Sequence, residues 1–129
     1  MRYFCKDGTP TEHAEQVAVI KWAEENLPAE INALFFAIPN GERTGWGTAK
    51  KTTAEGRKPG VPDLFLACAR LGYHGLFIEM KREKGGTVSA EQHAMHDALR
   101  LSGYFVAVCH GAELAKQTLC WYLGIEVKP

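Results

Sequence analysis

Four short segments of almost continuously apolar residues divide this chain of 129 residues. They cover residues 34–38, 63–68, 76–81 and 104–109, and turns or helix-forming stretches separate them. Continuous rather than alternating apolar patterning is typical of strands that helices cover on both faces. The pattern predicts an α/β fold with a small mixed four-stranded sheet flanked by helices.

A capping pattern indicates where the first helix begins. Thr9 suits the N-cap, Pro10 suits the first helical position, and Glu12 suits the third, where it would close a capping box. The helix is expected to run to about Asn26. Its apolar stripe turns polar at the N-terminal end, where Gln16 and Glu12 continue the line of apolar side chains.

Three further helices complete the predicted order, α-β-α-β-β-α-β-α. The first of them covers residues 48–55. The next follows Ser89, which has Gln92 as its capping-box partner, and ends near Ser102. The last covers about residues 112–123.

The composition fits one globular domain over residues 1–129, because 46% of the residues are apolar. The four cysteines form no C-x-x-C pair, so we expect reduced thiols rather than a zinc site or disulfides. No apolar run reaches the ~18–20 residues that cross a bilayer, and no signal peptide is recognisable. A cytoplasmic protein without membrane contact is therefore expected.

Basic side chains gather in one part of the chain although the formal net charge is zero. Against Glu55 alone, the segment 43–58 contains Arg43, Lys50, Lys51, Arg57 and Lys58. This surplus is a candidate for contacts with nucleic-acid phosphates, although a solvated loop and helix would have the same composition. Asn40 begins this region, Gly56 and Gly60 would let the backbone approach phosphates, and Trp46 could stack on an unpaired base.

Two acidic residues lie where two neighbouring strands are expected to pair as a hairpin. Asp63 begins the second apolar segment, and Glu79, Met80 and Lys81 end the third. Because side chains alternate along a strand, Glu79 and Lys81 point to one face and Met80 to the other. A carboxylate and an ammonium on a buried strand cost desolvation free energy unless they have partners or a function.

Binding of a divalent cation would explain these residues. Mg²⁺ prefers oxygen ligands and retains several waters, and Asp63, Glu79 and the Met80 carbonyl would supply such oxygens. A bound metal ion activates water and neutralises charge in phosphodiester cleavage, while Lys81 would orient the water or hold the phosphate. The alternative is an ordinary strand-start aspartate and a structural Glu–Lys pair.

Several blocks in order along the chain carry a resemblance to a known family. They read IPNG at 38–41, AEG at 54–56, KPGVPDL at 58–64, GLFIEMK at 75–81, SAEQ at 89–92 and GY at 103–104, with Arg43 between the first two. Together they resemble the VRR-NUC family, the virus-type replication-repair nucleases of the PD-(D/E)xK superfamily. The resemblance extends from about Glu12 to Leu123.

The resemblance implies a restriction-endonuclease-like fold and Mg²⁺- or Mn²⁺-dependent cleavage of DNA at branched or otherwise structured sites. Small stand-alone members, often encoded by phages or prophages, are similar to homodimeric Holliday-junction resolvases. A homodimer acting on junctions or flaps in a bacterial or phage-infected cell is therefore implied. The alternative is a DNA-binding module of the same fold that does not cleave.

The resemblance also implies site residues on two helices. It places a glutamate of the first helix at the metal, directly or through water; Glu12 fits this position best, and Glu15 is its rival. Gln92 corresponds to a family position that hydrogen-bonds the attacking water or the scissile phosphate. We expect the nearby His93 and His96 to be solvent-exposed or to face DNA rather than to bind zinc.

Overall fold

The computed structural model describes residues 3–39 and 54–126. Its elements are α1 (Glu12–Asn26), α2 (Ala29–Asn32), β1 (Phe35–Ala37), β2 (Leu64–Leu66), β3 (Leu76–Lys81), α4 (Ala90–Leu101), β4 (Phe105–His110) and α5 (Ala112–Leu123). The four predicted strands are present, and α2 is a short addition that the sequence did not predict. Most of the helix predicted over 48–55 lies outside the described residues.

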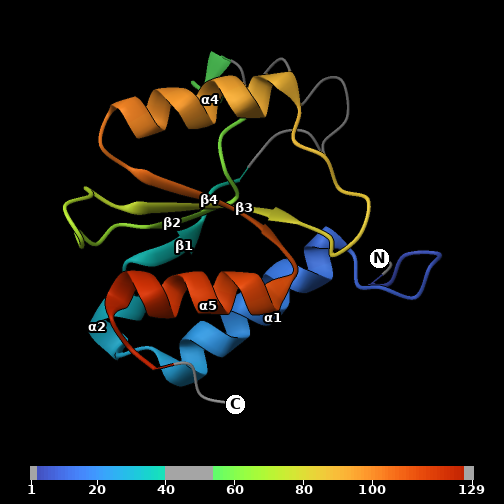
Figure 1. Cartoon of the computed structure of the whole chain (residues 1–129), viewed down its shortest axis with the longest axis horizontal. Coiled ribbons are helices and arrows are strands. Elements are labelled where there is room, and N and C mark those ends of the chain that lie inside the picture. Colours follow the sequence, from blue (N-terminus) through green and yellow to red (C-terminus); the bar gives the residue numbers. More distant parts are fainter. Residues whose placement is uncertain (1–2, 40–53, 127–129) are drawn as a thin grey trace.

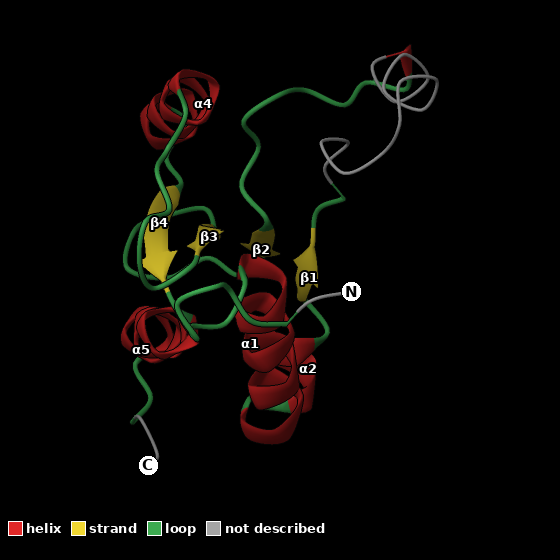
Figure 2. Cartoon of the chain, turned by 90° about the vertical axis from the view of Figure 1, so that its right-hand side faces the viewer, coloured by secondary structure: helices red, strands yellow, loops and turns green. Residues whose placement is uncertain are grey.

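The sheet is mixed, as predicted, with the strand order β1-β2-β3-β4. The β1–β2 and β2–β3 pairs are antiparallel, and β3 pairs with β4 in parallel. Between β2 and β3 the chain turns through Leu71 and Gly72, which both have positive φ. A parallel pair needs a crossover, and α4 supplies it. Helix α4 therefore covers one face of the sheet, while α1, α2 and α5 lie on the other (Figures 1 and 2).

The two faces of the sheet contact different helices because side chains alternate along each strand. Leu64, Leu66, Leu76, Ile78 and Met80 are fully buried and form one core with α1 and α5, mainly through Val19, Ala23, Ala115 and Leu119. The alternate residues of β3, including Glu79 and Lys81, are directed toward α4. The charged side chains of β3 thus lie on the sheet face opposite the main core.

Helix α1 begins two residues later than predicted. Thr11 is its N-cap, and the Thr11 hydroxyl accepts the Ala14 N–H at 3.1 Å. Thr9 instead donates its hydroxyl to Asp7 at 2.6 Å, so the prediction of Thr9 as N-cap was wrong. Glu12 is consequently the first helical residue and not the third, and the capping box predicted for it does not form. The capping box of Ser89 and Gln92 at α4 is confirmed.

Gly60 packs against the first turn of α4, three residues before Asp63. It is buried with φ +83°, and a Cβ atom there would lie 2.3 Å from the Glu91 carbonyl oxygen. The prediction that this glycine makes room for a phosphate is therefore replaced by a close contact between two backbone segments. Gly56 has a similar φ of +97° but open space around it.

We expect Gly60→Ala to lower the free energy of unfolding by about 3 kcal/mol or more, because it adds a backbone clash to an unfavourable φ. Gly56→Ala is the matched control. It should lower the free energy of unfolding by about 1 kcal/mol, because it adds only the strain of an alanine at positive φ. Urea denaturation of both variants measures the difference. Equal losses in the two variants would show that the contact between Gly60 and α4 does not constrain the fold.

The described helices include none that is long and apolar enough to span a bilayer. Cys5, Cys68, Cys109 and Cys120 are all free thiols, as predicted, and the last three are buried.

Candidate active site

The register of the β2–β3 hairpin brings Asp63 and Glu79 together. The last paired residues are Leu64 and Ile78, so continuing the register sets Asp63 directly opposite Glu79. Side chains at directly opposed positions have Cβ atoms about 4.5–5.5 Å apart. The hairpin alone therefore creates a pair of facing carboxyl groups at the end of the sheet.

Asp63 also reaches past Glu79 to the next residue of β3. Its Oδ2 atom accepts the Met80 N–H at 2.8 Å. Because the N–H and C=O of one strand residue point to the same edge, the Met80 carbonyl is directed to the side of the strand on which Asp63 lies. Strand geometry thus directs this carbonyl to the side of β3 on which the two carboxyl groups lie.

The two carboxyl groups are close enough to change the protonation of Glu79. Burial, a hydrogen bond to Asp63 and the charges of Asp63 and Glu12 together raise the pKa of Glu79 to about 9, while the charge of Lys81 opposes them. Glu79 is 1% exposed. Without a cation, the pair therefore retains a proton at neutral pH, which is the behaviour of carboxylates that repel each other in a shared site.

Lys81 and Gln92 form a buried contact between β3 and α4. The Lys81 ammonium donates to Gln92 Oε1 at 3.0 Å, and the same oxygen accepts the Ser89 N–H at 2.9 Å. Gln92 therefore closes the capping box of α4 and holds Lys81 at the same time. The Lys81 side chain lies on the same face as Glu79, with only 6% of the residue exposed.

His96 contacts Glu79 from α4, one turn after Gln92. Its Nε2 atom lies 3.2 Å from Glu79 Oε1, and the residue is 1% exposed. Burial, together with the charges of Arg100 and His93, lowers the pKa of His96, so the ring is neutral at neutral pH. The prediction that His96 is exposed or faces DNA was wrong, whereas His93 is exposed as predicted.

The two candidate glutamates of α1 have different surroundings in the structure. Glu15 is buried at the start of α5, where a hydrogen bond from the Ala112 backbone opposes the burial that raises the pKa of Glu15. Its Oε2 atom lies beside Gly111 and has no hydrogen-bond partner among the described residues. Glu12 is the one whose charge acts on Glu79. Of the two, Glu12 is therefore near the acidic pair.

The donor set fits a cation that keeps water in its coordination shell. Within residues 3–39 and 54–126, no three His, Cys, Asp or Glu side chains are arranged to hold a metal ion. Structural zinc sites need four protein ligands. Magnesium instead binds through one or two carboxylates with several waters, and Asp63, Glu79 and the Met80 carbonyl match that requirement.

Of the residues predicted to contact DNA, the structure describes Arg57 and Lys58. Arg57 and Lys58 are exposed, while Asn40, Arg43, Trp46, Lys50 and Lys51 lie outside the described residues.

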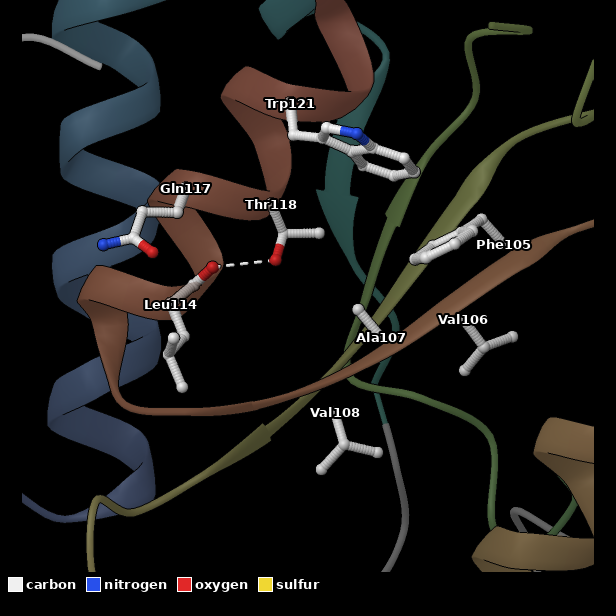
Figure 3. A pocket seen from close by; sticks show the side chains of 8 residues that line it. All are labelled: Phe105, Val106, Ala107, Val108, Leu114, Gln117, Thr118 and Trp121. Atoms are coloured by element: carbon white, nitrogen blue, oxygen red, sulfur yellow. Dashed lines mark hydrogen bonds between the residues drawn. The ribbon is translucent and has the colours of Figure 1, made fainter. Parts of the chain in front are cut away.

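An apolar groove of about 400 Å³ runs between β4 and α5 (Figure 3). It is lined by Phe105, Ala107, Leu114, Thr118 and Trp121, among others. The groove is on the α5 side and has no charged residue in its lining, so it is not part of the acidic site.

Comparisons with known proteins identify the family of the chain. The sequence profile of the VRR-NUC domain matches residues 9–113. The chain belongs to the VRR-NUC family. A solved structure described as a "VRR_NUC domain protein" is similar over 92% of this chain and 92% of its own, with 25% identity and a TM-score of 0.79. No curated protein matches the chain.

Membership of the VRR-NUC family implies a nuclease-type function in DNA processing. The family and the fold predicted from the sequence blocks are confirmed. His96 is the site residue that the sequence analysis assigned wrongly. The signal for it was its spacing: residues four apart share a helix face, so a buried Gln92 predicts a buried residue 96.

Proposed function

We propose that this VRR-NUC chain is a Mg²⁺- or Mn²⁺-dependent endonuclease that hydrolyses DNA phosphodiester bonds. The observation that carries the proposal is the pair of the half-buried Asp63 and the buried Glu79, with Lys81 on the same face. Like charges directly opposite each other on a sheet are destabilising. A bound cation would offset that cost, and strongly perturbed pKa values such as that of Glu79 cluster at functional sites.

Each residue then has a defined task. Asp63, Glu79 and the Met80 carbonyl would hold the cation, which when bound supplies an activated water and neutralises charge on the phosphate. Lys81, held by Gln92, directs its ammonium to a phosphate oxygen or to the attacking water. Glu12, at the start of α1, would reach the same cation directly or through water.

The direct test is a cleavage panel with the unmodified chain. Labelled duplex, flap, splayed and four-way DNA are incubated with Mg²⁺, Mn²⁺ or EDTA. We expect cutting only with a divalent cation and preferentially at branched substrates. The alternative, a DNA-binding module of the same fold, would shift DNA mobility without metal and give no product under any condition.

Selectivity for DNA structure rather than sequence is part of the proposal. The exposed Arg57 and Lys58 suit phosphate contacts, which position DNA without reading its bases. A two-fold homodimer would present two such sites to the opposed strands of a junction. Light scattering tests the dimer against the 14.3 kDa chain mass; a monomer would exclude paired cutting of junctions and leave flaps as the substrate.

Glutamine substitutions on α1 test which glutamate serves the site. Glu12→Gln should lower the cleavage rate by about tenfold or more, in line with the loss of a residue that acts through a metal-bound water. Glu15→Gln should leave the rate within about threefold and keep or raise the melting temperature, because it removes a buried charge without a full set of partners. Loss of cleavage in Glu15→Gln alone would reverse the assignment.

A further inference from the structure

Two polar side chains on one face of α4 meet the two charged side chains of β3. Gln92 and His96 are four residues apart and therefore lie one turn apart on that face. Gln92 Oε1 accepts from the Lys81 ammonium at 3.0 Å, and His96 Nε2 lies 3.2 Å from Glu79 Oε1. Helix α4 thus places an amide oxygen against the cationic side chain and a ring nitrogen against the carboxyl group.

A buried imidazole at this position has a cost that an apolar residue would not have. His96 and Glu79 are each 1% exposed, and a buried polar group costs free energy unless it is hydrogen-bonded. A leucine would fill similar space on the face of α4 that covers the sheet. The imidazole differs from leucine in one relevant way, which is the ring nitrogen that lies 3.2 Å from a carboxyl oxygen of Glu79.

We propose that His96 is a positioning residue for the cation: its Nε2–H donates to Glu79 Oε1 and holds that carboxylate in the orientation in which it meets Asp63. A neutral donor leaves the negative charge of Glu79 to the cation once the cation binds, whereas a lysine or arginine at this position would compete with the cation for that charge. Hydrogen bonds to ligating carboxylates are a common means of orienting them. The inference rests on the proposed function, because it needs a cation at Asp63 and Glu79.

The test measures Mn²⁺ binding by calorimetry in the absence of DNA. His96→Leu should weaken binding by about 10–100-fold, the usual effect of removing such a hydrogen bond. His96→Gln retains an N–H donor of similar reach and should recover most of the affinity. His93→Leu is the matched control on the exposed face of the same helix and should stay within about twofold of the unmodified chain, because it touches no ligand.

The outcomes separate the inference from the proposed function. If the unmodified chain binds Mn²⁺ and His96→Leu binds it equally well, or if His96→Gln is as weak as His96→Leu, the role of His96 is refuted while the function stands. If the unmodified chain does not bind Mn²⁺, the function itself fails. Thermal denaturation in EDTA checks folding.

Should the leucine variant not fold, His96→Asn replaces it, since asparagine is too short to reach Glu79. Weak binding by His96→Asn beside strong binding by His96→Gln supports the positioning role. Equal binding by the two variants contradicts it.

Discussion

Replacing Lys81 with methionine should abolish DNA cleavage while DNA binding survives. Methionine keeps most of the apolar stem that packs beneath Gly86 but removes the ammonium that Gln92 holds on the face of Glu79. Loss of a group that acts on the reacting phosphate or water lowers rates by about 10²–10⁴-fold. Single-turnover cleavage of the preferred substrate measures the rate, and a gel-shift assay without metal measures binding.

Lys116→Met is the control for this substitution. Lys116 is on α5, across the sheet from the acidic pair, where it forms an exposed i,i+3 pair with Glu113. Such surface pairs contribute at most about 0.5 kcal/mol to stability, so both cleavage and binding should be retained. A Lys81→Met variant that cuts within about tenfold of the unmodified rate would remove Lys81 from the chemistry.

Replacing Glu79 with glutamine should stabilise the metal-free protein and change how its stability depends on pH. Glu79 has a pKa raised from 4.5 to about 9 in the folded state. Between these values the folded protein holds a proton that the unfolded chain releases. The free energy of unfolding of the metal-free protein therefore falls as the pH rises through this window, and it levels off above about pH 9.

Glutamine is the neutral equivalent of the protonated side chain at every pH. Its oxygen can accept from His96 and its amide can donate to Asp63, so the contacts of Glu79 are kept. In EDTA at pH 8, Glu79→Gln should be more stable by about 1–4 kcal/mol, and the difference should shrink toward pH 4.5. Urea denaturation across the pH range measures both.

Addition of Mn²⁺ should reverse the order of stabilities. The unmodified chain gains free energy of unfolding from ligand binding, whereas the glutamine variant lacks a charged ligand and should gain little. Its cleavage should also be lost. A variant that is less stable than the unmodified chain in EDTA at pH 8, or that gains equally from Mn²⁺, would contradict the account of the acidic pair.

Sequence patterns predicted the elements whose boundaries depend on local chemistry. The bounds of β3 and α5 and the capping box at Ser89 follow from apolar runs and from side chains that satisfy their own backbone. The start of α1 was misjudged because Thr9 and Thr11 are both good caps. The contact that decided between them, the bond from Thr9 to Asp7, belongs to the preceding turn.

The sequence predicted the part of the candidate site that the β2–β3 hairpin forms. It did not predict the part that depends on the packing of α4 against the sheet. Asp63 and Glu79 meet because of a local β-register, which the sequence indicates. His96 and Gly60 acquire their roles only when α4 docks, Gly60 against the first turn of the helix and His96 against Glu79. The spacing of four residues places His96 on the same helix face as Gln92, but the burial of that face depends on how α4 packs against the sheet. No periodic signal marks the contact of Gly60.

Anomalous diffraction from a crystal soaked in Mn²⁺ tests most directly whether this hairpin holds a divalent cation. We predict one strong peak within coordination distance of the carboxylates of Asp63 and Glu79 and of the Met80 carbonyl. An Asp63→Asn crystal, in which the Met80 N–H still has an acceptor, should lack that peak. Manganese bound elsewhere on the chain, or none bound in the unmodified protein, would contradict the account.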